Sequence, residues 1–559
     1  MITDATRPAT LFVFALALLA PATAASETFY VDPQGGSPGG DGSKSDPWET
    51  LEQVVADDLI STRDWNDHPY DESRTLEPKN QGAPVGAGDT LVLESGYHGS
   101  VKIEGAYNKS DITIRAASGA TPKLSRLLLR ATEHWVIDGL VVSPSFADTY
   151  DNQTMISVDN HGWRGPSRDV TVKNCTLYSV DDASGWSKSD WDDRAANGIA
   201  AQGKDVTIEG NVVRNSNFAI SASGDRARVA GNTVDGFAGD GLRGLGDDGV
   251  FEYNVVKNAY DVNKNHDDGF QSWSNGPDGV GSGQVTGIVL RGNLFINHED
   301  PSHPLRTSLQ GIGCFDGMFV DWTIVNNVIV TDHWHGITLL GARDSRIVNN
   351  TLIDLDDSEP GPPWIKVGKH KTGTASKNVV IRNNIAPSIT TSSGVTADHN
   401  IEVADPSKHF VDPAGFDLHL LETSPAVDAG SAMMAPPVDR ERVPRPQGMA
   451  VDIGAYEWHA PGTLPGDAGG DAAGDVAATV DVAGSEDGGT PEEDAESSEE
   501  PRTDAAGSDL AAADARDTTP LEDQTPVSNG CTCTTPSDRS PAPSVLVVLI
   551  ALFVRRRRR

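Results

Sequence analysis

Short apolar runs recur along the middle of the chain, and each run carries an asparagine at the same place. An apolar residue lies three positions before this asparagine, and another lies two positions after it. The asparagines are Asn211, Asn232, Asn254, Asn293, Asn327, Asn350 and Asn384. Their shortest steps are 21, 22 and 23 residues, a period that is typical of a solenoid with short strands.

Each asparagine of this repeat is predicted to stack on its equivalent one turn away. Asparagine tolerates a left-handed turn, and its amide can hydrogen-bond the next asparagine in the stack. The apolar residues on either side of it would face a core that only the neighbouring turns can cover. The pattern therefore predicts an all-β fold, a right-handed parallel β-helix of roughly 10–12 turns.

A second repeat predicts a strand that follows each asparagine. Its inward column is Ile199, Ile220, Leu242, Phe270, Ile312 and Ile337. Because side chains alternate along a strand, the next residues point outward on one sheet face. This outward column is Ala200, Ser221, Arg243, Gln271, Gly313 and Thr338. A bend column enters the same strands and consists of Asn197, Phe218, Asp240, Asp268, Gln310 and His335.

The spacing between the repeats shows where loops are inserted. Segments 258–267, 275–285 and 298–308 are additions to the basic repeat, and all three are predicted to crowd around the strand DGFQSWS at 268–274. Insertions that only decorated the coil would be expected to scatter along it. We therefore predict that these loops wall a groove over one sheet face.

The N-terminal part of the chain divides into a leader and a cap. Residues 1–25 contain an apolar run followed by Ala22-Thr23-Ala24, which predicts a secretory signal peptide. Residues 26–87 are predicted to cover the open end of the coil, because an uncovered first turn would be an aggregation edge. The β-helix itself is assigned to residues 88–405.

The C-terminal part is assigned to three segments. Residues 406–460 form a second cap or anchor-type module. Residues 461–530 hold 18 Asp and Glu but only two Arg, so no core can form and we predict a disordered acidic linker. Residues 531–559 end in a short apolar run and five arginines, which predict a sorting or membrane segment with the arginines on the cytoplasmic side.

Two C-terminal patterns resemble surface-anchoring elements. Cys531-Thr532-Cys533, the apolar run at 545–554 and the terminal arginines resemble myxobacterial C-terminal sorting tags. Segments 410–430 and 451–458 resemble the choice-of-anchor module found after bacterial surface β-helices. These resemblances imply an exported protein that is held at the cell surface or outer membrane, by transient or permanent membrane attachment.

The charge of the chain restricts its partners. The formal net charge is −37 at pH 7, so nucleic acid is excluded as a partner, because phosphate binding needs a basic surface. We expect a monomer that binds a polysaccharide in the groove.

The cysteine content gives no sign of a disulfide scaffold. The only cysteines of residues 26–460 are Cys175 and Cys314. Cys175 takes a position of the asparagine repeat, and we predict that it is buried.

The candidate chemistry gathers around the segment NKNHDDGFQSWSNGPDG at 263–279. The predicted catalytic residues are Asp240, Arg243, Asp268, His335 and Lys366. The predicted substrate-binding residues are His266, Gln271, Trp273, Arg306 and His333. Asp267 and Asp268 offer hard oxygen ligands, so Ca²⁺ is the one candidate cofactor. Flat faces for stacking on sugar rings are offered by Trp186, Trp191, Trp273, Trp334 and Trp364.

Three chemistries fit these residues. β-Elimination from a uronic-acid polysaccharide needs a base and a cation that neutralises the carboxylate, and Arg243 or Lys366 could fill either role. Glycoside hydrolysis needs two carboxyls, for which Asp240 and Asp268 on adjacent turns are candidates. C5 epimerisation shares its first half with elimination. We favour the lyase narrowly, and the alternative of another class is a non-catalytic adhesin or carbohydrate-binding surface protein.

The coil over residues 88–401 resembles the pectin-lyase-like superfamily of β-helix proteins. That superfamily contains lyases, hydrolases, epimerases and adhesins, so the resemblance implies the fold more than the function. The Asp pair in HDDG at 266–269 resembles that of the polygalacturonase-type hydrolases. The Asn-Thr-Asp, Gly-His-Gly and Arg-Ile-Lys motifs of those enzymes are missing from this sequence, which puts the hydrolase assignment in doubt.

Overall fold

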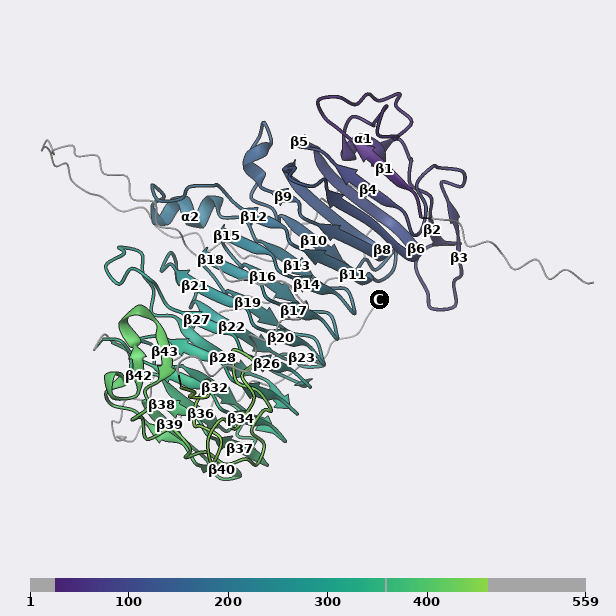
Figure 1. The fold of residues 1–559 in the computed structure, drawn as a ribbon. Helices are drawn as coiled ribbons and strands as arrows, with labels where there is room; N and C mark the ends of the chain where they lie inside the picture. The colour runs from purple at the N-terminus through teal and green to yellow at the C-terminus, as the bar shows by residue number, and fades with distance from the viewer. Residues whose placement is uncertain (1–25, 357–358, 461–559) are drawn as a thin grey trace, which may run out of the picture. The chain divides into compact units, whose positions relative to one another are not determined.

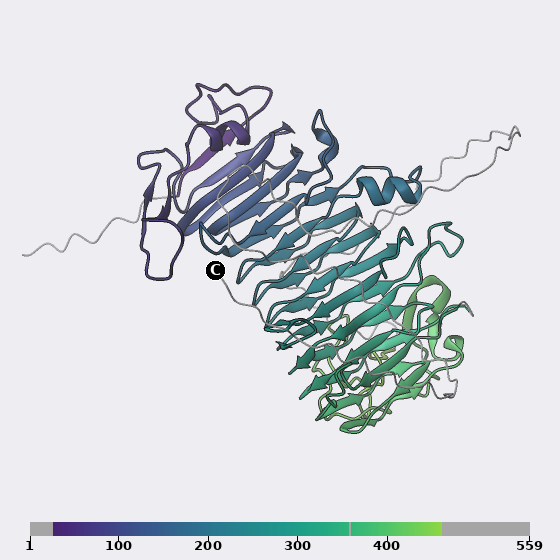
Figure 2. The same cartoon turned by 180° about the vertical axis from the view of Figure 1, so that it is seen from behind.

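The computed structural model describes residues 26–356 and 359–460, which all fall within one compact unit, Met1–Gly470. The predicted signal peptide, acidic linker and C-terminal sorting segment lie outside the described residues. The chain winds into a right-handed parallel β-helix (Figures 1 and 2). One of its faces carries twelve strands, one from each turn. The fold class is therefore confirmed, at the upper end of the predicted number of turns.

Three stacks of parallel strands form the faces of the coil. The first stack carries the predicted outward column and contains β10 (Ile156–Asp159), β13 (Ile199–Ala201), β16 (Ile220–Ala222), β19 (Leu242–Gly244), β22 (Asp268–Trp273), β28 (Gln310–Asp316), β32 (Ile337–Leu340), β36 (Trp364–Gly368) and β39 (Ser388–Thr390). The second stack contains β11 (Arg168–Lys173), β14 (Thr207–Glu209), β17 (Arg228–Ala230), β20 (Val250–Glu252), β26 (Val289–Arg291), β30 (Thr323–Val325), β34 (Arg346–Val348), β37 (Val379–Arg382) and β40 (Val395–Asp398). The long strands β6 (Ser100–Ala116) and β8 (Arg126–Asp138) run through both stacks in the early turns.

The third stack is the twelve-stranded face, and it begins beside the asparagine positions. It contains β5 (Gly96–Tyr97), β7 (Pro122–Leu124), β9 (Val141–Val142), β12 (Thr176–Tyr178), β15 (Val212–Ser216), β18 (Thr233–Phe237), β21 (Val255–Ala259), β27 (Leu294–Ile296), β31 (Val328–Val330), β35 (Thr351–Ile353), β38 (Ile385–Ala386) and β41 (Ile401–Glu402). The inward side chains of all three stacks meet in one continuous apolar core.

The strand register of the first stack agrees with the predicted columns. Leu242 pairs with Phe270, and Phe270 pairs with Ile312, in the inward column. Arg243 pairs with Gln271 in the outward column, one turn apart. The inward members are buried, whereas Arg243 and Gln271 are half-buried on the surface.

The predicted asparagines form a hydrogen-bonded ladder through the corner between the second and third stacks. Each Nδ2 donates to the Oδ1 of the next asparagine, at 2.9–3.0 Å, from Asn211 through Asn384 and on to Asn400. The buried Cys175 occupies the position before Asn211, and its backbone N–H donates to Asn211 Oδ1 at 2.9 Å. The ladder is thus confirmed, together with the burial of Cys175.

The expected role of the ladder asparagines in left-handed turns is wrong. Positive φ belongs to the residue before each of them, for example Gly231 (61°), Tyr253 (54°) and Asn326 (56°). The ladder residues themselves are not among the residues with positive φ. Asparagine is therefore required for its amide, which donates to one neighbour and accepts from another, and not for its backbone tolerance.

Glycine follows most members of the bend column because the backbone there approaches the core closely. A Cβ built on Gly241 would lie 2.4 Å from Val256 Cγ1, and one on Gly269 would lie 2.6 Å from Phe295 Cδ1. Real Cβ contacts are not this short. The glycine of each recurring Asp-Gly pair is therefore explained by packing, and this explanation is independent of the role of the aspartate.

Both ends of the coil are covered. At the N-terminal end, β1 (Thr28–Val31) pairs with β4 (Thr90–Leu93), and α1 (Leu51–Ala56) buries Leu51 and Val54 against the core. At the C-terminal end, a separate apolar cluster packs under β42 (Phe410–Asp412) and β43 (Asp417–Leu420). Within the described residues, no helix has the length and hydropathy of a membrane span.

Candidate functional site

Two aspartates of the bend column lie side by side beneath the surface of β19 and β22. Asp240 Oδ1 accepts the backbone N–H of Asp268 at 3.2 Å, and Asp240 Oδ2 accepts Arg243 Nε at 2.5 Å. Asp268 Oδ2 accepts His266 Nδ1 at 2.8 Å and Gln271 Nε2 at 2.9 Å. The side chains of Asp240 and Asp268 are only 1% and 0% exposed. A ligand at the surface would therefore contact the side chains that these aspartates bind, and not the aspartates themselves.

The groups that these carboxyls hold form the exposed part of the site. Arg243 extends between two aromatic rings, with its guanidinium carbon 3.6 Å from the ring centre of Phe218 and 5.4 Å from that of Trp273. This contact and the bond to Asp240 restrict the guanidinium to one position. His266 remains 30% exposed beside it. The surface above the two buried carboxyls therefore presents two cations.

The proton distribution in this cluster follows from its contacts. The hydrogen bond to Asp268 raises the pKa of His266 to about 9, despite the opposing effect of burial. Burial raises the pKa of Asp268 to about 7, and the bond from His266 opposes this rise. Burial also raises the pKa of Asp267 well above its ordinary value. His266 is therefore cationic at neutral pH, and Asp267 tends to keep its proton.

A group of histidines and tryptophans lies further along the same face. His335 Nδ1 shares a hydrogen bond of 2.9 Å with the Thr338 hydroxyl, which also accepts Trp364 Nε1 at 3.0 Å. The ring of His335 stacks on that of His333, with centres 5.1 Å apart. Lys366 Nζ lies 4.4 Å from the ring centre of Trp364. The sequence predicted Thr338 only as an outward residue. Its hydroxyl contacts with His335 and Trp364 could not be predicted, because they depend on the positions of those two side chains.

The two histidines of this group are held neutral. Burial lowers the pKa of His335 to about 3, with smaller effects from the nearby His333, Lys366 and His266. Burial likewise lowers the pKa of His333 to about 4. The same face thus carries a cationic histidine, His266, and two neutral ones. Phe315 is in edge contact with both kinds, with its ring centre 6.5 Å from His266 and 4.8 Å from His335.

The acidic residues predicted to hold Ca²⁺ are engaged elsewhere. Asp267 bonds the Thr307 side chain and is 3% exposed. Asp268 Oδ2 serves His266 and Gln271, and only its buried Oδ1 lacks a protein partner. Calcium takes six to eight oxygen ligands, so the residues in this arrangement do not fit it. Among the described residues, the one group of three potential ligands within 4.8 Å is Glu133, His134 and Asp169, away from this face.

The inserted loops form a wall with its own small core. Segments 258–267 and 298–308 pair with each other through the backbones of Asp261 and Leu305, at 2.7 Å. The helix α2 (Lys188–Arg194), from another insertion, joins them and buries Trp191. Trp191 is 3% exposed, so the expectation that it stacks on a sugar is wrong. Arg306 lies in this wall and pairs with Asp332 at 2.6 Å.

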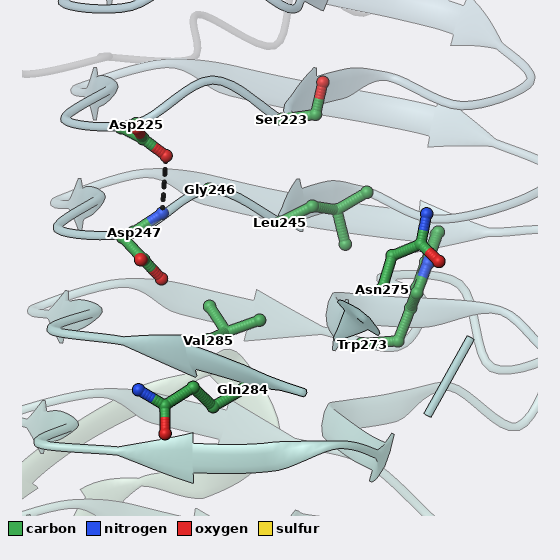
Figure 3. Close-up of a pocket in the computed structure, with 9 residues that line it drawn as sticks. All are labelled: Ser223, Asp225, Leu245, Gly246, Asp247, Trp273, Asn275, Gln284 and Val285. Carbon is green, nitrogen blue, oxygen red and sulfur yellow. Dashed lines mark hydrogen bonds between the residues drawn. The ribbon is translucent and has the colours of Figure 1, made fainter. Parts of the chain in front are cut away.

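The third insertion, 275–285, borders a separate pocket beside Arg243. Trp273 and Asn275 line one side of it, and Asp225 and Asp247 line the opposite side (Figure 3). The cavity has a volume of about 350 Å³. Of its lining residues only Trp273 was a candidate from the sequence, because the two aspartates come from a corner that carried no chemical signal.

Comparison with known proteins supports the fold. The family model described as "Right handed beta helix region" matches residues 154–403. No curated protein sequence matches the chain.

Several solved structures are similar to this chain at low identity. A pectate lyase, Pel9A, is 15% identical over 78% of this chain and 98% of its own, with a TM-score of 0.39. XylC in complex with xylose is 9% identical over 77% and 98%, with a TM-score of 0.43. The A-module of the mannuronan C-5 epimerase AlgE6 of Azotobacter vinelandii is 14% identical over 56% and 81%, with a TM-score of 0.35. Likenesses this distant carry no argument about function. The family match and the strand topology together establish residues 154–403 as a right-handed β-helix region.

Proposed function

We propose that the face of β19, β22, β28, β32 and β36 binds an anionic polysaccharide and cleaves it by β-elimination. One observation carries this proposal: Asp240 and Asp268 are buried, and each holds a cation, Arg243 or His266, at the surface. Such a surface complements the carboxylate of a uronic acid. The acidity of the whole chain does not oppose this, because short-range contacts dominate where the cations are fixed.

The residues of this face divide into three roles. Arg243 and His266 lie on adjacent turns and neutralise the substrate carboxylate, which acidifies the neighbouring C–H. His335 is assigned as the base because its Nε2 is open when Nδ1 donates to Thr338. Burial holds the pKa of free His335 at about 3, so this role requires the bound carboxylate to raise that pKa toward the working pH. The electron pair of that C–H forms a double bond, the glycosidic C–O bond on the next carbon breaks, and the leaving oxygen takes a proton from water. The proton on His335 then passes to the hydroxide that remains, which restores the base and the water.

The remaining predicted residues are assigned to substrate binding. Gln271 keeps one side of its amide on Asp268 and offers the other to a sugar hydroxyl. Trp273 and Trp364 offer half-buried rings for stacking. Lys366 and His333 extend the polar surface along the coil. No step of the proposal passes through Ca²⁺.

Hydrolysis by paired carboxyls is less well supported. A retaining or inverting glycosidase needs both carboxyls in contact with the substrate or its water. The side chains of Asp240 and Asp268 are 1% and 0% exposed and are bonded to Arg243 and His266. They would have to leave these partners to act, so we rank the hydrolase, and the epimerase, below the lyase.

The experiment is an activity screen of the purified whole chain on pectate, alginate, glycosaminoglycans and neutral glucans, each with Ca²⁺ and with chelator. We expect ultraviolet absorbance from a conjugated double bond on an acidic polymer, unchanged by the chelator. New reducing ends without that absorbance would replace the lyase by a hydrolase. Binding without any cleavage, in a protein shown to be folded, would favour the adhesin. Loss of activity with chelator would restore the predicted Ca²⁺ requirement.

We also propose that the protein is exported and held at the cell surface through residues 531–559, and that it acts as a monomer. The predicted signal peptide and the resemblance of the C-terminal segment to sorting tags support the location. Fractionation of cells that express the chain, with and without residues 531–559, tests it. Retention of the shortened chain at the surface would contradict the assigned anchor. Light scattering of the purified protein tests the monomer.

A further inference from the structure

The pocket beside Arg243 has the size and lining of a site for one sugar unit. Its volume of about 350 Å³ lies at the small end of the range for ligand pockets, about 300–1,000 Å³. Leu245 and Val285 lie between its two polar sides (Figure 3). Val285 is 1% exposed, so Leu245 and the ring of Trp273 supply the apolar contacts for the C–H face of a sugar, and the polar walls face its hydroxyls.

The wall formed by Asp225 and Asp247 is anionic and locally fixed. Asp225 Oδ2 pairs with Lys204 at 2.8 Å, and its Oδ1 accepts the backbone N–H of Asp247 at 3.3 Å. The hydrogen bond from Lys204 is the main reason why the pKa of Asp225 lies below its ordinary value. Asp247 Oδ1 accepts the backbone N–H of Thr286 at 2.8 Å, and the side chain is exposed on the pocket side.

The opposite wall offers neutral groups. Trp273 presents a half-buried ring, and Asn275 is an exposed amide at the start of the 275–285 insertion. Gln284, near the end of that insertion, is an exposed amide below Asp247 (Figure 3). None of the residues that line the pocket is cationic. The nearest described link to the cationic surface is Trp273, whose ring centre lies 5.4 Å from the guanidinium carbon of Arg243. Two surfaces of opposite charge therefore meet at Trp273.

We propose that this pocket binds a sugar unit without a carboxylate, next to the uronic acid held by Arg243 and His266. Carboxylate oxygens accept hydrogen bonds from sugar hydroxyls, whereas a second uronate would be repelled by Asp247. Asp225 adds less repulsion, because Lys204 neutralises it. The pocket borders the side of the face, so its occupant is a branch or a non-acidic neighbour in the polymer. The substrate class is thus a mixed or branched acidic polysaccharide, an inference that rests on the proposed function.

The binding test uses ligand-observed NMR on the whole chain with methyl glucoside, methyl galactoside and methyl galacturonide as probes. We expect at least one neutral glycoside to bind with a dissociation constant on the order of 1 mM, without competition from the galacturonide. Failure of both neutral glycosides to bind, or displacement of the bound glycoside by galacturonide at similar concentration, would overturn the proposal.

A charge-reversal pair locates the binding. Asp247→Lys should weaken the neutral glycoside at least about tenfold and leave galacturonide binding at Arg243 unchanged. Asp248→Lys is the matched control, because Asp248 is exposed and lies outside the pocket. Its backbone is left-handed (φ 58°), but Arg226 has the same conformation one turn earlier (φ 56°), so the coil accepts a long basic side chain there. Equal effects of the two variants would overturn the pocket assignment.

Polymer substrates separate this inference from the proposed function. We expect Asp247→Lys to lower cleavage of a branched acidic polymer about tenfold and to spare an unbranched polyuronate. Equal loss on both polymers would overturn the pocket inference while the lyase proposal survives. Neutral glycoside binding that Asp247→Lys abolishes, in a chain that cleaves no acidic polymer, would uphold the pocket and overturn the lyase.

Discussion

The asparagine ladder and the bend column are two stacks with one side chain per turn, polar throughout the ladder and polar at every position of the bend column except Phe218. They differ in where the second hydrogen bond of their polar members goes. In the ladder, each amide bonds only other parts of the coil, so the stack is closed on itself. In the bend column, Asp240 also uses one oxygen on the next turn, as Asn197 does. Its other oxygen holds Arg243 at the surface.

Under the proposed function, this difference separates structural from functional use of a buried polar group. A closed amide stack satisfies its members and has nothing left to offer a ligand. A carboxyl in the same kind of position needs a cation, and that cation lies where a ligand can reach it. Four substitutions or conditions test the distinction, in order of decreasing expected effect.

Asn293→Ala should destabilise the coil by about 3 kcal/mol, because it removes bonds to Asn254, Asn327 and the Phe251 carbonyl inside the core. Chemical denaturation measures the loss. Asn265→Ala, in an exposed loop position, is the control and should change stability by less than about 0.5 kcal/mol. A tolerated Asn293→Ala would mean that water replaces the amide, and that the ladder is not closed.

Asp268→Asn should lower the lyase rate about 100-fold, because the hydrogen bond that raises the pKa of His266 weakens. NMR titration of His266 should show its pKa moving down from about 9. In the unaltered protein the rate should fall as pH rises through about 9, when His266 loses its proton. Asp278→Asn makes the same charge change at an exposed position and should have full activity. An unchanged His266 pKa in Asp268→Asn would contradict the assigned cause.

His335→Gln should make the free energy of unfolding depend less on pH. The loss of stability between pH 8 and pH 5 should be smaller in the variant than in the unaltered protein by about 1–2 kcal/mol. Burial lowers the pKa of folded His335 to about 3, so below pH 6.5 the unfolded chain binds the extra proton. The stability from neutral His335 is thus present above pH 6.5 and is lost as pH falls toward 3. Denaturation at pH 8 and pH 5 measures the difference. Exposed His399→Gln is the control, and an equal effect there would rule out burial as the cause.

Asp240→Asn should have the smallest effect on stability, within about 1 kcal/mol. Asn197 already accepts a backbone N–H at 3.2 Å from the same column, so an amide can replace the structural oxygen of Asp240. The ion pair with Arg243 is lost, and uronate binding should weaken even though the fold remains. A large loss of stability, with binding intact, would show that Asp240 is structural like the ladder.

The repeats were predictable because a solenoid turns sequence period into spatial register. The spacing of Ile220, Leu242 and Phe270 was sufficient to place Arg243 beside Gln271, as the strand pairing has it. The asparagine column was also predictable, although the left-handed backbone conformation was assigned to the asparagine itself and belongs to the residue before it. Each of these features depends only on the residue one turn above or below.

The pairing of the charged groups was not predictable. The sequence by itself determined which residues of the coil point outward, since alternation and period are local properties of the chain. Only the tertiary structure decided that Asp240 and Asp268 are buried and bonded to Arg243 and His266, that Trp191 belongs to the wall, and that Asp225 and Asp247 face Trp273 across a pocket. Burial and partner choice depend on inserted loops and side-chain packing, which a repeat pattern does not encode.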